Sequence, residues 1–140
     1  MLEIDAKSRM ATGATVAVPA LGYENARAAV EWLITAFGAE ARTVIPGPGE
    51  SIGHAEVWIN EACVMLGSLT ATPTPPTIRG QSAVYVAMRR DADVDAMHAR
   101  ATAHAARVVK PLQDTPYGSH EFGVLDVEGN YWAFGTYVPK

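Results

Sequence analysis

The chain has 140 residues, of which 49% are apolar and 19% are charged, and its formal net charge at pH 7 is −4. This length suits a single domain, because two independent domains would have about 70 residues each, near the lower limit for a self-sufficient core. The mildly acidic charge argues against a nucleic-acid-binding protein, and no apolar run approaches the roughly 18 residues of a membrane span. The lone cysteine, Cys63, excludes an internal disulfide, and the first residues lack the layout of a signal peptide, so we expect a soluble, cytoplasmic protein.

Apolar spacing and turn residues predict the elements of the first half. In chain order, we expect a strand over Thr15–Ala20, a helix over Ala26–Phe37, a strand over Ala41–Ile45, a strand over Ile52–Ile59 and a returning strand over Ala62–Leu69. Asn25 is a suitable cap for the start of the helix, and Gly38 is a good terminator. Within the strand over residues 52–59, alternation places His54, Glu56 and Trp58 on one face.

The segment Thr70–Gly80 contains three prolines and four threonines, a composition typical of a linker. Beyond it, we expect a strand over Ser82–Met88, a helix that starts at Asp91 or Asp93 and runs to about Ala105, a short strand at Val108 and Val109, a loop over Gln113–Gly118, and a hairpin of strands over His120–Asp126 and Tyr131–Val138. Both sides of the linker therefore share the order strand, helix, strand, strand, strand.

Matching residues indicate that this unit is an internal repeat. His54 matches His120 at a spacing of 66 residues, and the Val64–Leu66 triplet aligns with Trp132–Phe134 at a spacing of 68. A four-stranded sheet with one helix has only one face covered, so neither half is expected to be stable alone. We therefore predict one α+β domain in which two βαβββ modules, residues 15–69 and 81–138, are joined by the linker over residues 70–80. Their mixed, curved sheets are expected to form a cleft.

Several segments resemble a known family. Residues 117–122 (Tyr-Gly-Ser-His-Glu-Phe), 126–130 (Asp-Val-Glu-Gly-Asn) and 132–137 (Trp-Ala-Phe-Gly-Thr-Tyr) look like the C-terminal signature of the vicinal oxygen chelate superfamily, and more narrowly of its glyoxalase/bleomycin-resistance branch. Residues 28–33 and 36–40 are similar to the first helix of that branch and its exit. The resemblance implies paired βαβββ modules and homodimers whose clefts are shared between chains. The activities it implies range from metal-dependent isomerases and dioxygenases to metal-free drug-sequestering proteins.

The resemblance also gives the positions of a metal site. The metal enzymes of the family use His, Gln or Glu near the middle of the first and last strands of each module. In this chain those positions fall near Val18, at Met65, at or beside Ser82, and at Ala133. Valine and alanine have no ligating atom, and a thioether suits a hard divalent ion poorly. We therefore expect no metal ion and no other cofactor at this site.

The candidate catalytic residues are His54, Glu56, His120 and Glu121. In one interpretation they transfer protons, because histidine titrates near neutral pH. In a second, His54 and His120 bind a divalent metal ion with a nearby carboxylate at a displaced site. In a third, they are only polar residues at the rim of the sheet.

The candidate ligand-binding residues are Trp58, Met65, Tyr85, Phe122, Tyr131 and Ala133. The small side chain at Ala133 leaves space in the cleft, and aromatic walls with a few polar groups suit an organic ligand. We therefore predict metal-independent binding of a hydrophobic or aromatic small molecule, in the manner of drug or metabolite sequestration. The alternatives are a glyoxalase-like lyase or isomerase that uses the His and Glu residues or a displaced metal ion, and a structural or regulatory dimer. Whether the chain is an enzyme stays open at this point.

Overall fold

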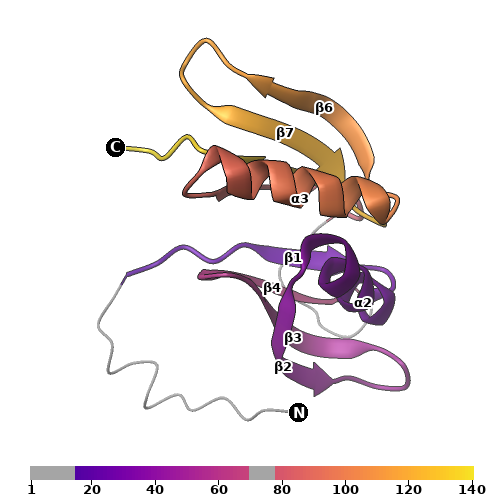
Figure 1. Cartoon of the computed structure of the whole chain (residues 1–140). Coiled ribbons are helices and arrows are strands. Elements are labelled where there is room, and N and C mark those ends of the chain that lie inside the picture. The colour runs from indigo at the N-terminus through magenta and orange to yellow at the C-terminus, as the bar shows by residue number, and fades with distance from the viewer. Residues whose placement is uncertain (1–14, 70–77) are drawn as a thin grey trace.

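The computed structural model describes residues 15–69 and 78–140, which form two four-stranded sheets, each accompanied by one helix (Figure 1). The first half contains β1 (Ala20–Tyr23), α2 (Ala26–Phe37), β2 (Glu40–Pro46), β3 (Ile52–Ile59) and β4 (Ala62–Ser68). The second half contains β5 (Ala83–Ala87), α3 (Asp91–Ala103), β6 (Arg107–Asp114), β7 (His120–Leu125) and β8 (Tyr131–Gly135). Most of the predicted linker, Thr70–Gly80, lies outside the described residues.

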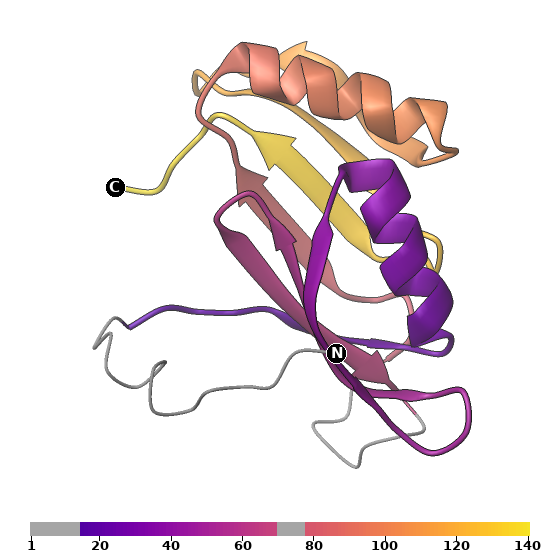
Figure 2. The ribbon, with the colours of Figure 1, turned by 60° about the horizontal axis from the view of Figure 1, so that its bottom comes forward.

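The two sheets have the same topology. Their strand orders are β1-β4-β3-β2 and β5-β8-β7-β6. In each sheet the first strand pairs in parallel with the last, while the other pairs are antiparallel. The two helices contact each other, and Figure 2 shows them meeting along one side of the molecule. This repeated unit confirms the predicted α+β class and the paired βαβββ modules.

Local signals define α2. The side chain of Asn25 accepts a hydrogen bond from the Ala28 N–H at 3.1 Å, and Gly38 ends the helix in the left-handed region at φ 67°. Both features agree with the prediction, because Asn is a favoured cap and Gly adopts a positive φ without steric cost. In the described part of the chain, neither helix has the length and apolarity needed to span a membrane.

The core lies between the helices and the sheet faces that they cover. In β3, Ala55 and Val57 are buried, as alternation predicts for the face turned towards α2. Phe37 at the end of α2 packs edge-on against Trp132 and Phe134 of β8, with ring centroids 5.2 Å and 4.9 Å apart. This aromatic contact links the first helix to the second sheet.

A buried aspartate also joins the two halves. Asp126 follows β7, is 7% exposed, and accepts hydrogen bonds from the Tyr23 hydroxyl at 2.6 Å and the Trp132 indole N–H at 3.0 Å. Burial and the nearby Asp126 carboxylate raise the pKa of Tyr23 well above its usual value. The hydroxyl therefore stays protonated and donates a hydrogen bond to Asp126. Glu128 in the same turn accepts hydrogen bonds at 2.7 Å from the backbone N–H groups of residues 24–25, just before α2. The turn between β7 and β8 therefore fixes the start of α2 relative to the second sheet.

The first strand differs from its prediction. It begins at Ala20 and runs to Tyr23, whereas the sequence predicted a strand over Thr15–Ala20. Pro19 has no N–H to donate to a ladder, so regular pairing starts after it. The carbonyl of Pro19 still accepts a hydrogen bond from the Met65 N–H at 2.9 Å, which holds the preceding extended segment near β4.

The start of α3 also differs. The cap residue is Arg90, which makes no side-chain cap, so neither Asp91 nor Asp93 caps the helix as predicted. Asp91 is instead the first helical residue, and Asp93 pairs with the Arg90 guanidinium at 2.8 Å. Acidic residues in the first turn still stabilise the helix, because they face the positive end of its dipole.

β6 is much longer than the two-residue strand predicted at residues 108–109. It runs through residue 114 and so includes Gln113, for which the sequence predicts a loop. Its register with β7 shifts on both sides of Lys110, which accommodates Pro111 within the strand. Exposed polar residues and an internal proline give no alternating pattern, so pairing with β7 rather than local sequence defines this strand.

Candidate functional site

A mainly apolar pocket of about 860 Å³ lies beside the face of the first sheet that α2 leaves uncovered. Its walls come from the extended segment before β1, the β3–β4 hairpin and the edge strand β5 of the second half. The lining residues are Val16–Pro19, Trp58, Glu61–Met65 and Val84–Val86. Pockets for small organic ligands typically have volumes of roughly 300–1,000 Å³, so this one is large enough for such a ligand.

Trp58, Met65 and Tyr85, three of the predicted ligand-binding residues, line this pocket. Trp58 and Met65 project away from α2, because the intervening residues of β3 and β4 are the ones buried in the core. Tyr85 is 40% exposed on β5, and its hydroxyl donates a hydrogen bond to the Tyr137 carbonyl at 2.7 Å. The structure thus brings together apolar groups from both modules.

Trp58 is held in place by a cation. The Arg42 guanidinium carbon lies 4.5 Å from the centroid of the Trp58 ring, and Arg42 also forms a 3.5 Å ion pair with Glu40. A guanidinium over an indole ring is a favourable cation–π contact. A second, more polar pocket of about 910 Å³ adjoins the first and includes Arg42 and Arg89.

His54 and Glu56 form a polar pair on the same face of β3 as Trp58. Nε2 of His54 lies 2.9 Å from a carboxylate oxygen of Glu56, whose side chain is 8% exposed. The Cα partner of Glu56 is Met65, so the pair adjoins the pocket. An imidazole oriented by a carboxylate can accept or donate a proton, and this is the chemistry that the enzyme alternative requires.

Glu121 is the centre of a hydrogen-bond cluster on the second sheet. Its carboxylate, in a side chain that is 5% exposed, accepts hydrogen bonds from Lys110 at 2.5 Å, from the Ser119 hydroxyl at 3.0 Å and from the Tyr117 hydroxyl. Burial alone would raise the pKa of Glu121, but Lys110, Tyr117 and Ser119 hold it below its usual value. A carboxylate held ionised in this way is poorly suited to donate a proton near neutral pH.

Tyr131 and Ala133 lie on the uncovered face of the second sheet and do not line the apolar pocket. The ring of Tyr131 lies across Gly123, where a Cβ atom would collide with it. A Cβ atom at Gly135 would come within 2.8 Å of the Glu121 Cβ. Gly123 and Gly135 therefore make room for Tyr131 and Glu121 of the chain itself.

Phe122 and His120 lie on the face of β7 turned towards α3. Phe122 is 0% exposed, with its ring stacked on Phe134 at a centroid distance of 5.3 Å and in edge contact with His98 at 5.0 Å. His120 lies 2.6 Å from a carboxylate oxygen of Asp95 in α3. Phe122, a predicted ligand-binding residue, is therefore a core residue, and His120, a candidate catalytic residue, lies on the helix side of the second sheet.

A slip of one residue in the repeat alignment explains why His120 was matched to His54 although the two side chains lie on different faces of their sheets. When the aligned triplets of β4 and β8 are superposed, the strand pairings make His54 equivalent to Glu121 and not to His120. A shift of one residue turns a strand side chain to the opposite face. His54 and His120 consequently do not meet, and the displaced metal site that combined them is not formed.

The residues at the family's metal positions do not fit a metal ion. Met65 and Ala133 are central in β4 and β8, and their Cα partners in the adjacent parallel strands are Ala20 and Tyr85. This set contains no imidazole and no carboxylate, which are the usual ligands for divalent ions in such sites. Within residues 15–69 and 78–140, the one group of three side chains close enough to hold an ion lies elsewhere and consists of Asp91, Asp114 and His120.

Sequence reasoning missed two parts of these surfaces. The partners of Glu121 were missed because β6 was predicted too short to carry Lys110 next to β7. The pocket wall over Val16–Pro19 was missed because those residues were expected to pair as a strand. Tyr117, the first residue of the signature segment over residues 117–122 and a partner of Glu121, was a signal in the sequence that could have been used.

Comparisons with known proteins agree with this architecture. The family profile described as Glyoxalase/Bleomycin resistance protein/Dioxygenase superfamily matches residues 15–134. An uncharacterised protein of Mycobacterium tuberculosis strain H37Rv is 32% identical over 128 residues, which cover 86% of this chain and 73% of the relative. TioX from Micromonospora sp. ML1 has 32% identity and a TM-score of 0.70, with 89% of this chain and 100% of that chain covered. Lactoylglutathione lyase from Agrobacterium tumefaciens shares the fold, with a TM-score of 0.68, 21% identity, and coverage of 87% of this chain and 92% of that chain.

Proposed function

The chain belongs to the Glyoxalase/Bleomycin resistance protein/Dioxygenase superfamily, and on this premise we propose that it binds a hydrophobic, aromatic small molecule without a metal ion. The observation that carries the proposal is the mainly apolar pocket of about 860 Å³ with Trp58, Met65 and Tyr85 in its walls. Sequestration of a drug or a metabolite is the role that such binding serves.

The chemistry of the lining residues supports this ligand class. Indole and phenol rings offer a large contact area at a small cost in conformational entropy. Met65 is flexible and polarisable, so it adapts to the outline of a ligand. Because Arg42 packs on Trp58 at 4.5 Å, the indole is already held near its place before a ligand arrives.

The donor set supports binding without a metal ion. Met65 and Ala133, with their strand partners Ala20 and Tyr85, offer no imidazole and no carboxylate at the central positions of the sheets. In the apolar pocket, where Met65 and Tyr85 form part of the wall, a ligand is therefore expected to be held mainly by apolar contact. Affinity is therefore expected to depend on apolar surface and to be insensitive to chelators.

The test is a thermal-shift screen of planar aromatic compounds, followed by affinity measurements on variants. A compound that binds the native state raises the melting temperature by mass action. Met65→Glu places a carboxylate in the apolar wall, and because an unpaired charge is costly to desolvate, affinity is expected to fall at least tenfold. Val127→Glu is the matched control, since Val127 lies in the turn between β7 and β8, outside the pocket, and is 50% exposed.

Two results would contradict the proposal. One is a folded wild-type protein whose melting temperature no compound raises. The other is an affinity that Met65→Glu and Val127→Glu leave equally unchanged. Turnover of a bound compound that is lost in His54→Gln would instead favour the acid–base enzyme, because Nε2 of His54 lies 2.9 Å from Glu56 beside the same pocket.

A further inference from the structure

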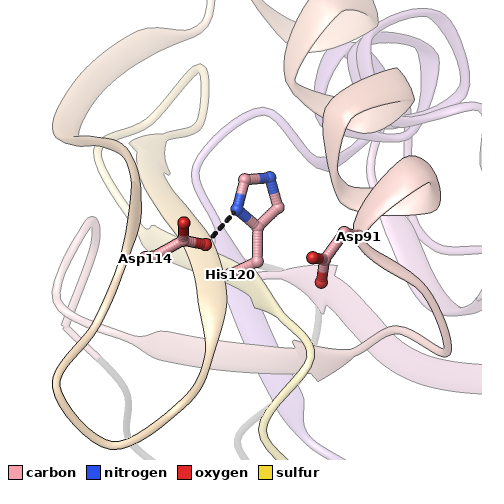
Figure 3. Close-up of side chains that lie close together, drawn as sticks. All are labelled: Asp91, Asp114 and His120. Carbon is pink, nitrogen blue, oxygen red and sulfur yellow. Dashed lines mark hydrogen bonds and ion pairs between the residues drawn. The ribbon is translucent and has the colours of Figure 1, made fainter.

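One histidine and three aspartates gather where α3 meets the β6–β7 hairpin, away from the apolar pocket. Asp91 and Asp95 lie in the first turns of α3, Asp114 is the last residue of β6, and His120 is the first residue of β7. Figure 3 shows the His120 ring between Asp114 on one side and Asp91 on the other. Three separate elements therefore contribute side chains to this cluster.

The spacing along α3 directs two carboxylates towards His120. Asp91 and Asp95 are four residues apart, so they lie on the same face of the helix. Asp93, between them, points elsewhere and pairs with Arg90 at 2.8 Å. The arrangement is thus specific to the two outer aspartates and is not a general feature of an acidic helix start.

The distances suit a shared ion. Three potential ligand atoms lie within 4.8 Å of one another, one each from Asp91, Asp114 and His120. Ligand atoms around a tetrahedral zinc ion lie about 3.3 Å apart. Asp91 and Asp114 are both exposed, so rotation of their side chains can close the difference without a change in the backbone.

Asp95 supplies an independent feature of a metal-binding histidine. Its carboxylate oxygen lies 2.6 Å from Nε2 of His120, while Nδ1 faces Asp114 at 2.8 Å. Both distances are hydrogen-bond distances to carboxylates, so in the metal-free chain each ring nitrogen donates a proton, and an ion that binds Nδ1 takes the place of the proton shared with Asp114. Metal-ligating histidines almost always donate their other ring N–H to a carboxylate or carbonyl in this way, which fixes the tautomer and the ring orientation.

The charge of the cluster also favours a cation. Three carboxylates surround one imidazole, and within the described parts of the chain no Lys or Arg side chain forms an ion pair with any of the three. The cluster therefore has a net charge of about −2 even when His120 is protonated. The side chain of His120 is 17% exposed, so the ring is already held in place by its surroundings.

We propose that Asp91, Asp114 and Nδ1 of His120 bind a divalent transition-metal ion of the Zn²⁺ class, with Asp95 orienting the imidazole from outside the coordination sphere. One nitrogen and two carboxylate oxygens are a donor set that zinc accepts, and water completes the coordination. The bound ion links the start of α3 to the β6–β7 hairpin. This site lies on the helix side of the second sheet and takes no part in the ligand pocket.

The experiment is a competition titration of the full chain with Zn²⁺ against a chromogenic chelator, after removal of metal ions. The wild-type protein is expected to bind one Zn²⁺ and to melt at a higher temperature when loaded. Asp114→Asn and His120→Gln are each expected to weaken binding at least tenfold, because each removes a ligand. Asp95→Asn is expected to weaken it about tenfold while leaving all three ligands in place.

Matched controls come from the same region. Asp93→Asn and His104→Gln are expected to retain wild-type affinity, because neither side chain belongs to the cluster. Co²⁺ absorption supplies a second readout, in which loaded wild type shows the visible bands of a four-coordinate ion and Asp114→Asn does not. Each variant is compared with its own metal-free form by circular dichroism, so that loss of folding is not taken for loss of binding.

Three outcomes overturn the proposal. The first is a folded wild-type chain that binds no Zn²⁺ in the titration. The second is binding that Asp114→Asn and His120→Gln leave unchanged. The third is binding that is lost in His54→Gln and kept in His120→Gln, which would place the ion on the first sheet.

Discussion

Among single residues, Glu121 shows how the fold stabilises a buried charge. Its side chain is 5% exposed, yet Lys110, Ser119 and Tyr117 all donate to it. Removing one partner of a buried ion pair is costly, because the other charge is left without compensation. Glu121 is therefore best understood as a stabilising residue of the second sheet, although the sequence suggested a catalytic role.

This assignment predicts a pH-dependent stability. The pKa of Glu121 in the folded chain lies below its usual value of 4.5. Its contribution is therefore present above that pH and is lost as the pH falls through the folded-state pKa. Glu121→Gln is expected to lower the unfolding free energy by about 2 kcal/mol at neutral pH, and the difference from wild type is expected to narrow in acid. Urea unfolding at a series of pH values measures this difference.

Glu50→Gln is the control for that series, because the Glu50 side chain is 96% exposed and its pairing with Arg27 is screened by water. Its stability is expected to follow the wild-type curve at every pH. A Glu121→Gln deficit that stays constant from neutral to acid pH would show that the loss is steric and not electrostatic.

The placement of residues was predictable only as far as the strand register was known. Alternation put Trp58 on the same face as His54, in a strand whose end is marked by the tight turn after residue 59, and the family resemblance put Met65 at a cleft position. His120 was matched to His54 because weak residue matches set the repeat alignment one residue out, and Phe122 was proposed as a ligand-binding residue for its aromatic ring, without a strand face assigned to it. An error of one residue in the register of a strand assigns each side chain to the opposite face of the sheet.

Among the helices and strands, α2 is the element whose boundaries the sequence predicts most accurately. Its first and last residues were predicted correctly because Asn25 and Gly38 act through contacts within a few residues of the chain. β6 was predicted poorly, because its exposed residues and Pro111 show no strand pattern in the sequence. These residues adopt a strand conformation only because they pair with β7. Local capping is therefore readable from sequence, whereas a strand formed by long-range pairing is not.

The cap of α2 gives a prediction at this scale. Asn25→Ala removes the side-chain acceptor that lies 3.1 Å from the Ala28 N–H. It is expected to lower the unfolding free energy by about 1 kcal/mol in urea titrations. Asn25→Asp keeps an acceptor at the same position and is expected to remain close to wild type. Equal losses in both variants would contradict a capping role.

For the whole molecule, the central feature is that the pocket draws its walls from both modules. Trp58 and Met65 come from the first sheet and Tyr85 comes from the second. The hydrogen bonds of Asp126 to Tyr23 and of Glu128 to the start of α2 hold the modules together. The pocket is therefore a property of the assembled pair and does not exist in either half alone. The internal repeat and the resemblance to a two-module family made this architecture predictable, whereas no local signal specifies contacts more than 100 residues apart.

The measurement that tests the ligand pocket most directly is a methyl NMR titration of the chain with ¹³C-labelled methionine methyl groups. The chain has five methionines, among which Met65 lines the apolar pocket and Met97, a residue of α3, is buried in the core. An aromatic compound that raises the melting temperature is expected to shift the Met65 resonance and to leave that of Met97 in place. A compound that binds yet leaves Met65 unshifted would contradict the account.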